Sequence, residues 1–125
     1  VKREVRYGDS RFDLAFSCGG SPWFMEVKGV TLDMDGTAMF PDAPTERGVK
    51  HILELVRAVE EGLDATLFFV VQIENIHSVS PNDETHPAFG EALRFAAFRG
   101  VNVRAYDCLV TPDSISIRRP VPVIL

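Results

Sequence analysis

The segment at residues 65–71 constrains the fold of this chain more than any other, because it is short and apolar almost throughout. Such a run has the length of a strand and is far shorter than the roughly 20 residues that cross a bilayer. A strand with no polar face is typical of the centre of a sheet that is covered on both sides. The sequence therefore predicts a mixed α/β fold, in which helices flank both faces of a central sheet.

Alternating segments precede this run and predict strands. Residues 11–16 and 22–28 each alternate apolar and polar side chains, and the turn residues at 18–21 join them into a hairpin. A second hairpin is expected over residues 30–40, before the two prolines within residues 41–44 end its last strand.

Two helices are predicted from a 3.6-residue periodicity. Thr45 is a suitable N-cap for a helix that runs to Glu61, and Gly62 follows at the C′ position. One side of this helix carries the apolar residues Val49, Ile52, Leu53, Val56 and Val59. A polar connection at residues 73–87 leads to the second helix, which is expected over residues 87–99.

Strands at residues 101–106 and 114–118, the second at an edge of the sheet, complete the prediction. No repeat, low-complexity tract or linker interrupts the 125 residues, so residues 1–125 predict a single domain. Thirteen Lys and Arg residues stand against 18 Asp and Glu residues, a net charge of −5. This balance excludes a histone-like protein that binds nucleic acid by bulk charge, so any such contact needs a local basic patch.

The two cysteines, Cys18 and Cys108, lie far apart with no CxxC spacing. This pattern excludes a thiolate zinc site and offers no disulfide framework, and reduced thiols are expected. The chain starts with charged residues and shows no signal-peptide segment, so we expect a cytoplasmic protein that does not contact a membrane.

Three charged residues of the first predicted hairpin form a candidate metal site. Asp13 lies mid-strand on the face away from its apolar neighbours, while Glu26 and Lys28 share one face of the next strand. Two carboxylates make an all-oxygen site suited to Mg²⁺ or Mn²⁺. A lysine beside the ion can orient or deprotonate a water, or stabilise charge on a phosphate. This is the residue pattern of a PD-(D/E)xK nuclease core.

The same pattern has a plainer interpretation, because an alternating Glu-Val-Lys is more often a solvated strand face. The aromatic residues Phe12, Phe16 and Phe24 favour the metal site, since they set the charges among apolar groups. Charges beside large apolar groups tend to be paired or functional, because their desolvation must be offset.

Several longer stretches resemble the sugar fermentation stimulation protein family. The most specific of them reads Phe-Pro-Asp-Ala-Pro-Thr-Glu-Arg-Gly at residues 40–48 and is followed by Lys50 and His51. The segments at residues 3–13, 26–32, 70–72 and 81–89 also look like parts of this family, so the resemblance covers most of the chain.

The resemblance implies a bacterial or archaeal cytoplasmic protein of two domains. The first, an OB-like barrel, would be absent from this sequence, and residues 1–125 would form the second, a restriction-endonuclease-like domain. The resemblance also implies a DNA-binding protein linked to the regulation of sugar metabolism, notably that of maltose. The missing N-terminal domain would help it to bind DNA.

Residue by residue, the resemblance assigns Asp13 and Glu26 as ligands of one Mg²⁺ or Mn²⁺ ion and Lys28 as the lysine of the nuclease motif. The backbone carbonyl of Val27 is a usual further ligand in that superfamily. Glu4 matches an acidic residue that commonly sits ahead of the core, often on a preceding helix.

Two further surfaces are expected to contact partners. Arg47, Lys50 and His51 form a basic stripe on the first helix, which is either a solvated face or a phosphate-binding surface beside the metal. On the second helix, Phe95 and Phe98 point away from the apolar stripe. A helix that is apolar on both sides is buried twice or faces a partner, so these residues are expected to contact a second copy or the missing domain.

Three functions follow as hypotheses. The first is a Mg²⁺-dependent nuclease that cleaves a phosphodiester by metal-activated water. The alternative is a non-catalytic DNA-binding transcriptional regulator that keeps the same fold and site. The intact triad favours the enzyme, whereas the acidic charge and the regulatory description of the family favour the regulator. An interaction module built on Phe95 and Phe98 would instead self-associate tightly and bind no metal.

Overall fold

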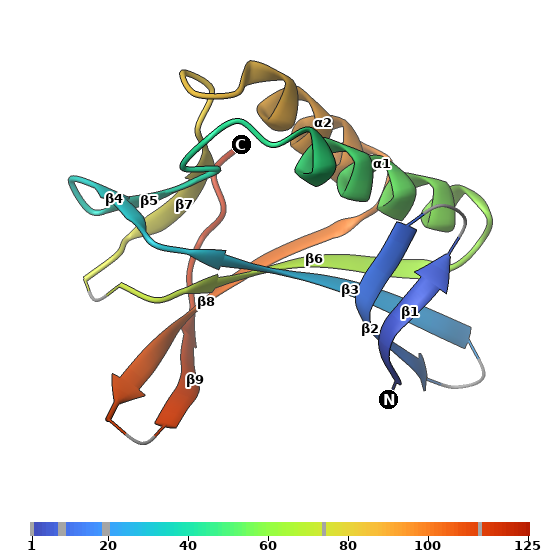
Figure 1. Ribbon diagram of the computed structural model, residues 1–125, viewed down its shortest axis with the longest axis horizontal. Coiled ribbons are helices and arrows are strands. Elements are labelled where there is room, and N and C mark those ends of the chain that lie inside the picture. Colours follow the sequence, from blue (N-terminus) through green and yellow to red (C-terminus); the bar gives the residue numbers. More distant parts are fainter. Residues whose placement is uncertain (1, 8–9, 19–20, 74, 113) are drawn as a thin grey trace.

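The computed structural model describes residues 2–7, 10–18, 21–73, 75–112 and 114–125, with side chains described from residue 24 onward apart from 74, 109–111, 113 and 115. Its elements follow one another along the chain (Figure 1) as β1 (Lys2–Tyr7), β2 (Ser10–Cys18), β3 (Ser21–Val30), β4 (Leu32–Met34), β5 (Thr37–Phe40), α1 (Glu46–Glu60), β6 (Asp64–Val71), β7 (Ser78–Pro81), α2 (Pro87–Phe98), β8 (Asn102–Thr111) and β9 (Ser114–Pro120).

The larger of two sheets has six strands in the order β1-β2-β3-β6-β8-β9 and is mixed, as the sequence predicts. The first three strands pair antiparallel, whereas β3, β6 and β8 run parallel, and β9 returns antiparallel at the edge. The strand β6 therefore has a parallel neighbour on each side and is central. Strands β4, β5 and β7 form the second, smaller sheet.

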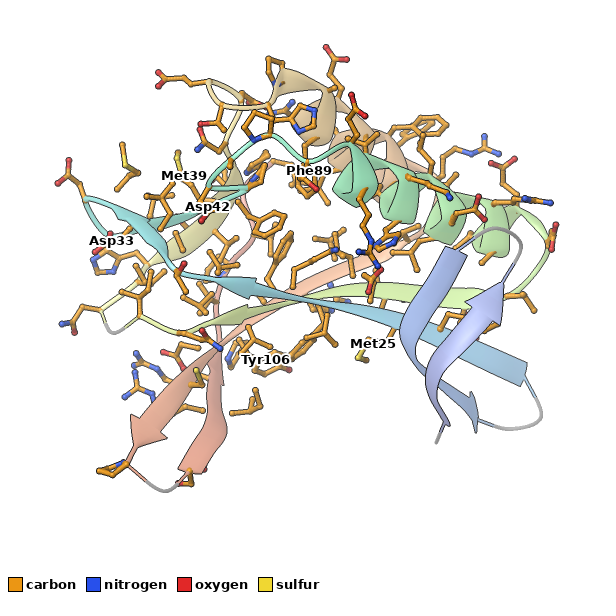
Figure 2. The ribbon with its side chains drawn as sticks, in the orientation of Figure 1. Met25, Asp33, Met39, Asp42, Phe89 and Tyr106 are labelled. Carbon is orange, nitrogen blue, oxygen red and sulfur yellow. The ribbon has the colours of Figure 1, made fainter. Side chains whose placement is uncertain are left out.

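Both helices lie on the same face of the larger sheet, so the expectation of helices on both faces is wrong for the part of the chain that the structure describes. Figure 1 shows α1 and α2 side by side on one side of β3, β6 and β8. Figure 2 shows Phe89 on this helix side and Met25 and Tyr106 on the opposite side. The core lies between the sheet and the two helices, where the ring of Phe40 packs against those of Phe69 and Phe89.

The apolar run in β6 predicts cover on both faces of the sheet, but the two faces of β6 are not equally buried. Phe69 and Val71 face the helices and are fully buried, whereas Phe68 and Val70 are only half-buried. The ring of Phe68 stacks on that of Tyr106, with the centroids 5.3 Å apart. Aromatic packing within one sheet face thus covers part of that face without a second helical layer.

The ends of α1 lie at the predicted signals. The hydroxyl of Thr45 accepts a hydrogen bond from the backbone N–H of Gly48 at 2.9 Å, and Gly62 follows the helix with a φ of +87°. The predicted apolar side is wrong at Leu53, which is 46% exposed. The buried face instead includes Leu55 and Ala58, so it is rotated around the helix axis away from Leu53.

The connection at residues 73–87 contains β7, a strand that its polar composition does not predict. It pairs in parallel with β5. Next to it, the buried amide of Asn82 donates to the carbonyl oxygen of Pro41 at 3.1 Å. The Nδ1 atom of His86 accepts the backbone N–H of Thr45 at 3.0 Å. Both side chains fix the entry to α1, so His86 is a structural residue and not the ordinary surface residue that the sequence suggests.

The outer face of α2 carries exposed aromatic residues, with Phe95 47% and Phe98 86% exposed. We predict that Phe98→Lys changes the free energy of unfolding by no more than about 0.5 kcal/mol, as surface substitutions do, because a cation also suits a helix C-terminus. Urea titration checks this, and sedimentation should show weaker self-association if the face binds a second copy. A strongly destabilised variant would mean that Phe98 belongs to the core.

No helix in the described part of the chain is long and apolar enough to cross a membrane.

A buried carboxylate joins β9 to β8. Asp107 accepts hydrogen bonds from the guanidinium of Arg118 at 2.9 Å and from the backbone N–H of Arg119 at 2.9 Å. The Arg118 guanidinium is the main reason why the pKa of Asp107 is lowered from 3.8 to about 2. Asp107 thus stabilises the folded chain above about pH 4, and this contribution is lost as the pH falls toward 2.

We predict that Asp107→Asn lowers the free energy of unfolding by about 2 kcal/mol at pH 7, the scale of charge-assisted hydrogen bonds. The difference from the parent chain should shrink at pH 3, because the carboxylate is then protonated in the unfolded state. Urea unfolding at both pH values checks this. Asp83→Asn is the matched control, since Asp83 pairs with Arg94 at the exposed surface. An equal loss in both variants, or a loss independent of pH, would contradict the prediction.

Candidate metal centre

The strand β3 presents two of the predicted site residues, Glu26 and Lys28, to the helix side of the sheet. Glu26 is only 2% exposed, Lys28 is half-buried, and Phe24 on the same face is buried. The alternation expected for this strand is confirmed. A solvated strand face does not describe Glu26, because its side chain is buried and its carboxylate contacts His51.

The register of β1, β2 and β3 places two further acidic residues in line with Glu26. The pairing of β2 with β3 extends to Leu14 and Met25, so the next step places Asp13 opposite Glu26. The pairing of β1 with β2 is in phase on both sides of Asp13 and places Glu4 opposite it. Glu4 therefore lies on a strand and not on a preceding helix. Three acidic residues occupy one row across three neighbouring strands, and the side chains of Glu4 and Asp13 are outside the described residues.

Helix α1 brings His51 to the same place. Its Nδ1 atom lies 2.8 Å from Oε2 of Glu26 and 3.4 Å from Nζ of Lys28. The His51 side chain is only 12% exposed. The sequence predicts one basic stripe of Arg47, Lys50 and His51, but Arg47 and Lys50 are exposed whereas His51 faces the sheet.

A signal for this position of His51 was present in the sequence. His51 immediately precedes Ile52 and lies four residues before Leu55, both of which are fully buried. A residue with these neighbours lies at the border of the buried helix face. What the sequence does not contain is the strand that this border meets, because that depends on how the helix packs.

A further carboxylate, that of Glu54, lies one turn after His51 on α1. Its side chain is 14% exposed, and its Oε2 atom is buried without a hydrogen-bond partner. The nitrogen Nη1 of Arg57 is 3.8 Å from this oxygen, too far for a hydrogen bond. A buried carboxylate oxygen that lacks a hydrogen bond is costly unless a cation balances it. Sequence reasoning missed Glu54 because a charge on an exposed-looking helix face carries no sign of burial.

The donors of this region suit a hard divalent cation. Carboxylate and carbonyl oxygens are the ligands that Mg²⁺ and Ca²⁺ prefer, and the row that contains Glu26 supplies carboxylates. Within the side chains that the structure describes, no three His, Cys, Asp or Glu residues form a group that could hold a metal ion. A metal-binding group in the row of acidic residues would have to include Asp13. The strand register places the backbone of Asp13 opposite that of Glu26. Val27 lies between Glu26 and Lys28 on β3, and its carbonyl stays a predicted ligand.

Comparison with known proteins adds an independent observation. A family model described as "Sugar fermentation stimulation protein RE domain" matches residues 1–114. Two curated relatives are named "Sugar fermentation stimulation protein homolog". The one from Clostridium perfringens (strain SM101) is 49% identical over 126 residues, and the one from Clostridium beijerinckii is 50% identical over 125 residues. Each alignment covers 100% of this chain and 55% of the relative, so the chain spans about half the length of these relatives.

A solved structure is also similar to this chain. It is described as "The structure of Pyrococcus Furiosus SfsA in complex with Ca2+". The two share 32% sequence identity and superpose with a TM-score of 0.93, over 100% of this chain and 55% of the solved one.

Proposed function

We propose that this chain, which belongs to the sugar fermentation stimulation protein family, is a nuclease-type domain. It would use Mg²⁺ or Mn²⁺ to cleave phosphodiester bonds in DNA. The proposal draws on the family membership and on the geometry around Glu26. We propose a restriction-endonuclease-like core of the PD-(D/E)xK type for the chain. The observation that carries the proposal is the buried carboxylate of Glu26, in register with Asp13 on β2 and two residues from Lys28 on one strand face.

Asp13 and Glu26 would hold the cation, with the carbonyl of Val27 as a further ligand and Glu4 next in the row. The burial of Glu26 supports this assignment, because positive charge nearby stabilises a carboxylate that is shielded from water. The similar Pyrococcus furiosus protein is described as a complex with Ca²⁺, which prefers oxygen ligands of the same kind. A bound divalent cation would supply positive charge beside the scissile phosphate and the attacking water.

Lys28, two residues after Glu26 on β3, would assist the same reaction. Its ammonium group lies on the strand face of Glu26, where it can stabilise negative charge that develops on the phosphate or orient a water. Arg47 and Lys50 on α1 are exposed and would hold the phosphates of the DNA backbone. These contacts must act locally, because the net charge of −5 repels DNA as a whole.

The second candidate function is a DNA-binding transcriptional regulator that keeps this site without turnover. The acidic net charge of −5 supports it, since a regulator needs to bind only selected DNA sites and not DNA in general. The family is named for the stimulation of sugar fermentation, which suits a regulator as well as an enzyme.

Incubation of the full-length protein with duplex DNA, single-stranded DNA and RNA separates the two functions. The nuclease proposal predicts cleavage of DNA with Mg²⁺ or Mn²⁺, none in EDTA, and none by the matched variant Glu26→Gln under any condition. Sequence-selective DNA binding without cleavage in any divalent metal would contradict the nuclease and favour the regulator.

A further inference from the structure

The ring of His51 lies between the two charged residues of β3. Its Nδ1 atom is 2.8 Å from Oε2 of Glu26 and 3.4 Å from Nζ of Lys28. Glu26 and His51 are both largely shielded from solvent, with side chains 3% and 12% exposed. A contact of this length in a shielded setting has a much larger effect on side-chain orientation than an exposed ion pair.

The proton on the ring can be placed from these two distances. A carboxylate oxygen only accepts hydrogen bonds, and a charged lysine only donates them. One ring nitrogen cannot donate to Glu26 and accept from Lys28 at the same time. The shorter contact, to Oε2, is attractive only when Nδ1 carries a proton, because a bare nitrogen lone pair would repel the oxygen. The shorter contact therefore favours the proton on Nδ1. Among the described residues, Oε2 of Glu26 nevertheless has no hydrogen bond of full geometry, so the two groups are close in distance without being aligned.

We propose that His51 is a positioning residue of the metal site, which orients the carboxylate of Glu26 for the cation. This inference rests on the proposed function. A carboxylate has about four lone-pair positions, so the contact with His51 is compatible with a cation on the same group. Without His51, Glu26 would keep its place on β3 but lose a close contact of its carboxylate. Residues that orient metal ligands in this way commonly change metal affinity about 10- to 100-fold when they are replaced.

This role differs from the phosphate contact that the basic stripe suggested for His51. A phosphate-binding residue has to reach solvent, as Arg47 and Lys50 do, whereas the His51 side chain is turned toward the sheet. A phosphate contact would leave cation affinity in the absence of DNA unchanged. Cation affinity measured without DNA thus distinguishes the two roles.

Three variants of the full-length protein test the proposal, with Ca²⁺ and Mn²⁺ as probes in calorimetric titrations without nucleic acid. His51→Asn places an amide N–H close to the position of Nδ1 and should bind both cations within about threefold of the parent protein. His51→Gln places its amide near the position of Nε2, and His51→Leu has no donor. Both should bind about 10- to 100-fold more weakly.

The Asn and Gln variants differ mainly in where the amide lies, so their comparison stands even if the Leu variant fails to fold. His77→Gln is the matched control, because His77 is exposed on the loop before β7, and it should bind like the parent protein. Equal affinities of the Asn and Gln variants would overturn the role of His51. A parent protein that binds neither cation would instead overturn the proposed function.

Discussion

Replacing Lys28 with alanine should lower DNA cleavage by about 10²- to 10³-fold while leaving divalent-cation binding unchanged or tighter. Lys28 lies on the same strand face as Glu26, so its ammonium group repels a cation bound there. Removing it leaves every oxygen ligand in place. Cleavage should still fall, because the group that stabilises charge near the transferring phosphate is gone, and such groups supply rate factors of this size.

Single-turnover cleavage rates and Ca²⁺ titrations on the parent protein and on Lys28→Ala measure the two effects separately. Lys28→Arg is the informative companion variant, because it keeps the charge but cannot give up a proton near neutral pH. Partial activity in this variant would indicate charge stabilisation, and full loss would indicate proton transfer. Unchanged cleavage by Lys28→Ala would show that the lysine has been assigned wrongly. If the site only binds DNA, Lys28→Ala should instead remove about one phosphate contact. The slope of log affinity against log salt concentration should then become smaller by about one.

Asp13→Asn and Glu26→Gln should each weaken Ca²⁺ binding by about 100-fold or more, and the double variant should bind no worse than either one. Both residues are assigned to one ion, and the register places them opposite each other on neighbouring strands. Once one ligand of a shared ion is gone, the second contributes little, so the two losses should not add. The substitutions keep the shape of each side chain and remove only its charge.

Calorimetric titration of the four proteins gives the coupling between the two positions. Glu54→Gln is the matched control on α1, because it neutralises another poorly exposed carboxylate without changing the row across β1, β2 and β3. Additive losses in the double variant would mean that Asp13 and Glu26 act independently and do not share one ion. A loss in Glu54→Gln as large as that in Glu26→Gln would extend the ligand set to α1.

The parts of the fold that could be predicted are those with local signals. Alternation in β2 and β3 determines which residues share a face, and it correctly placed Glu26 beside Lys28. The cap at Thr45 and the left-handed Gly62 are equally local, so the ends of α1 follow from the sequence. These signals depend only on the residue and its near neighbours along the chain.

The parts that could not be predicted depend on packing between distant segments. The strand β7 forms because it pairs with β5, and its own residues carry no local signal that predicts this pairing. Leu53 looked apolar and helical, but packing selected a face centred away from it. His51 looked like part of a charged stripe, and only the placement of α1 on the sheet brings its ring to Glu26. Sequence periodicity indicates which side of a helix is buried. It does not indicate which strand a given side chain on that side will contact.

The most direct test of the metal centre is the position of a bound cation in crystals of the full-length protein grown with Ca²⁺. The proposal predicts one ion between β2 and β3, with carboxylate oxygens of both Asp13 and Glu26 at about 2.3–2.6 Å, and its loss in Asp13→Asn. An ion bound elsewhere, or carboxylates of Asp13 and Glu26 directed to opposite faces of the sheet with no ion between them, would contradict it.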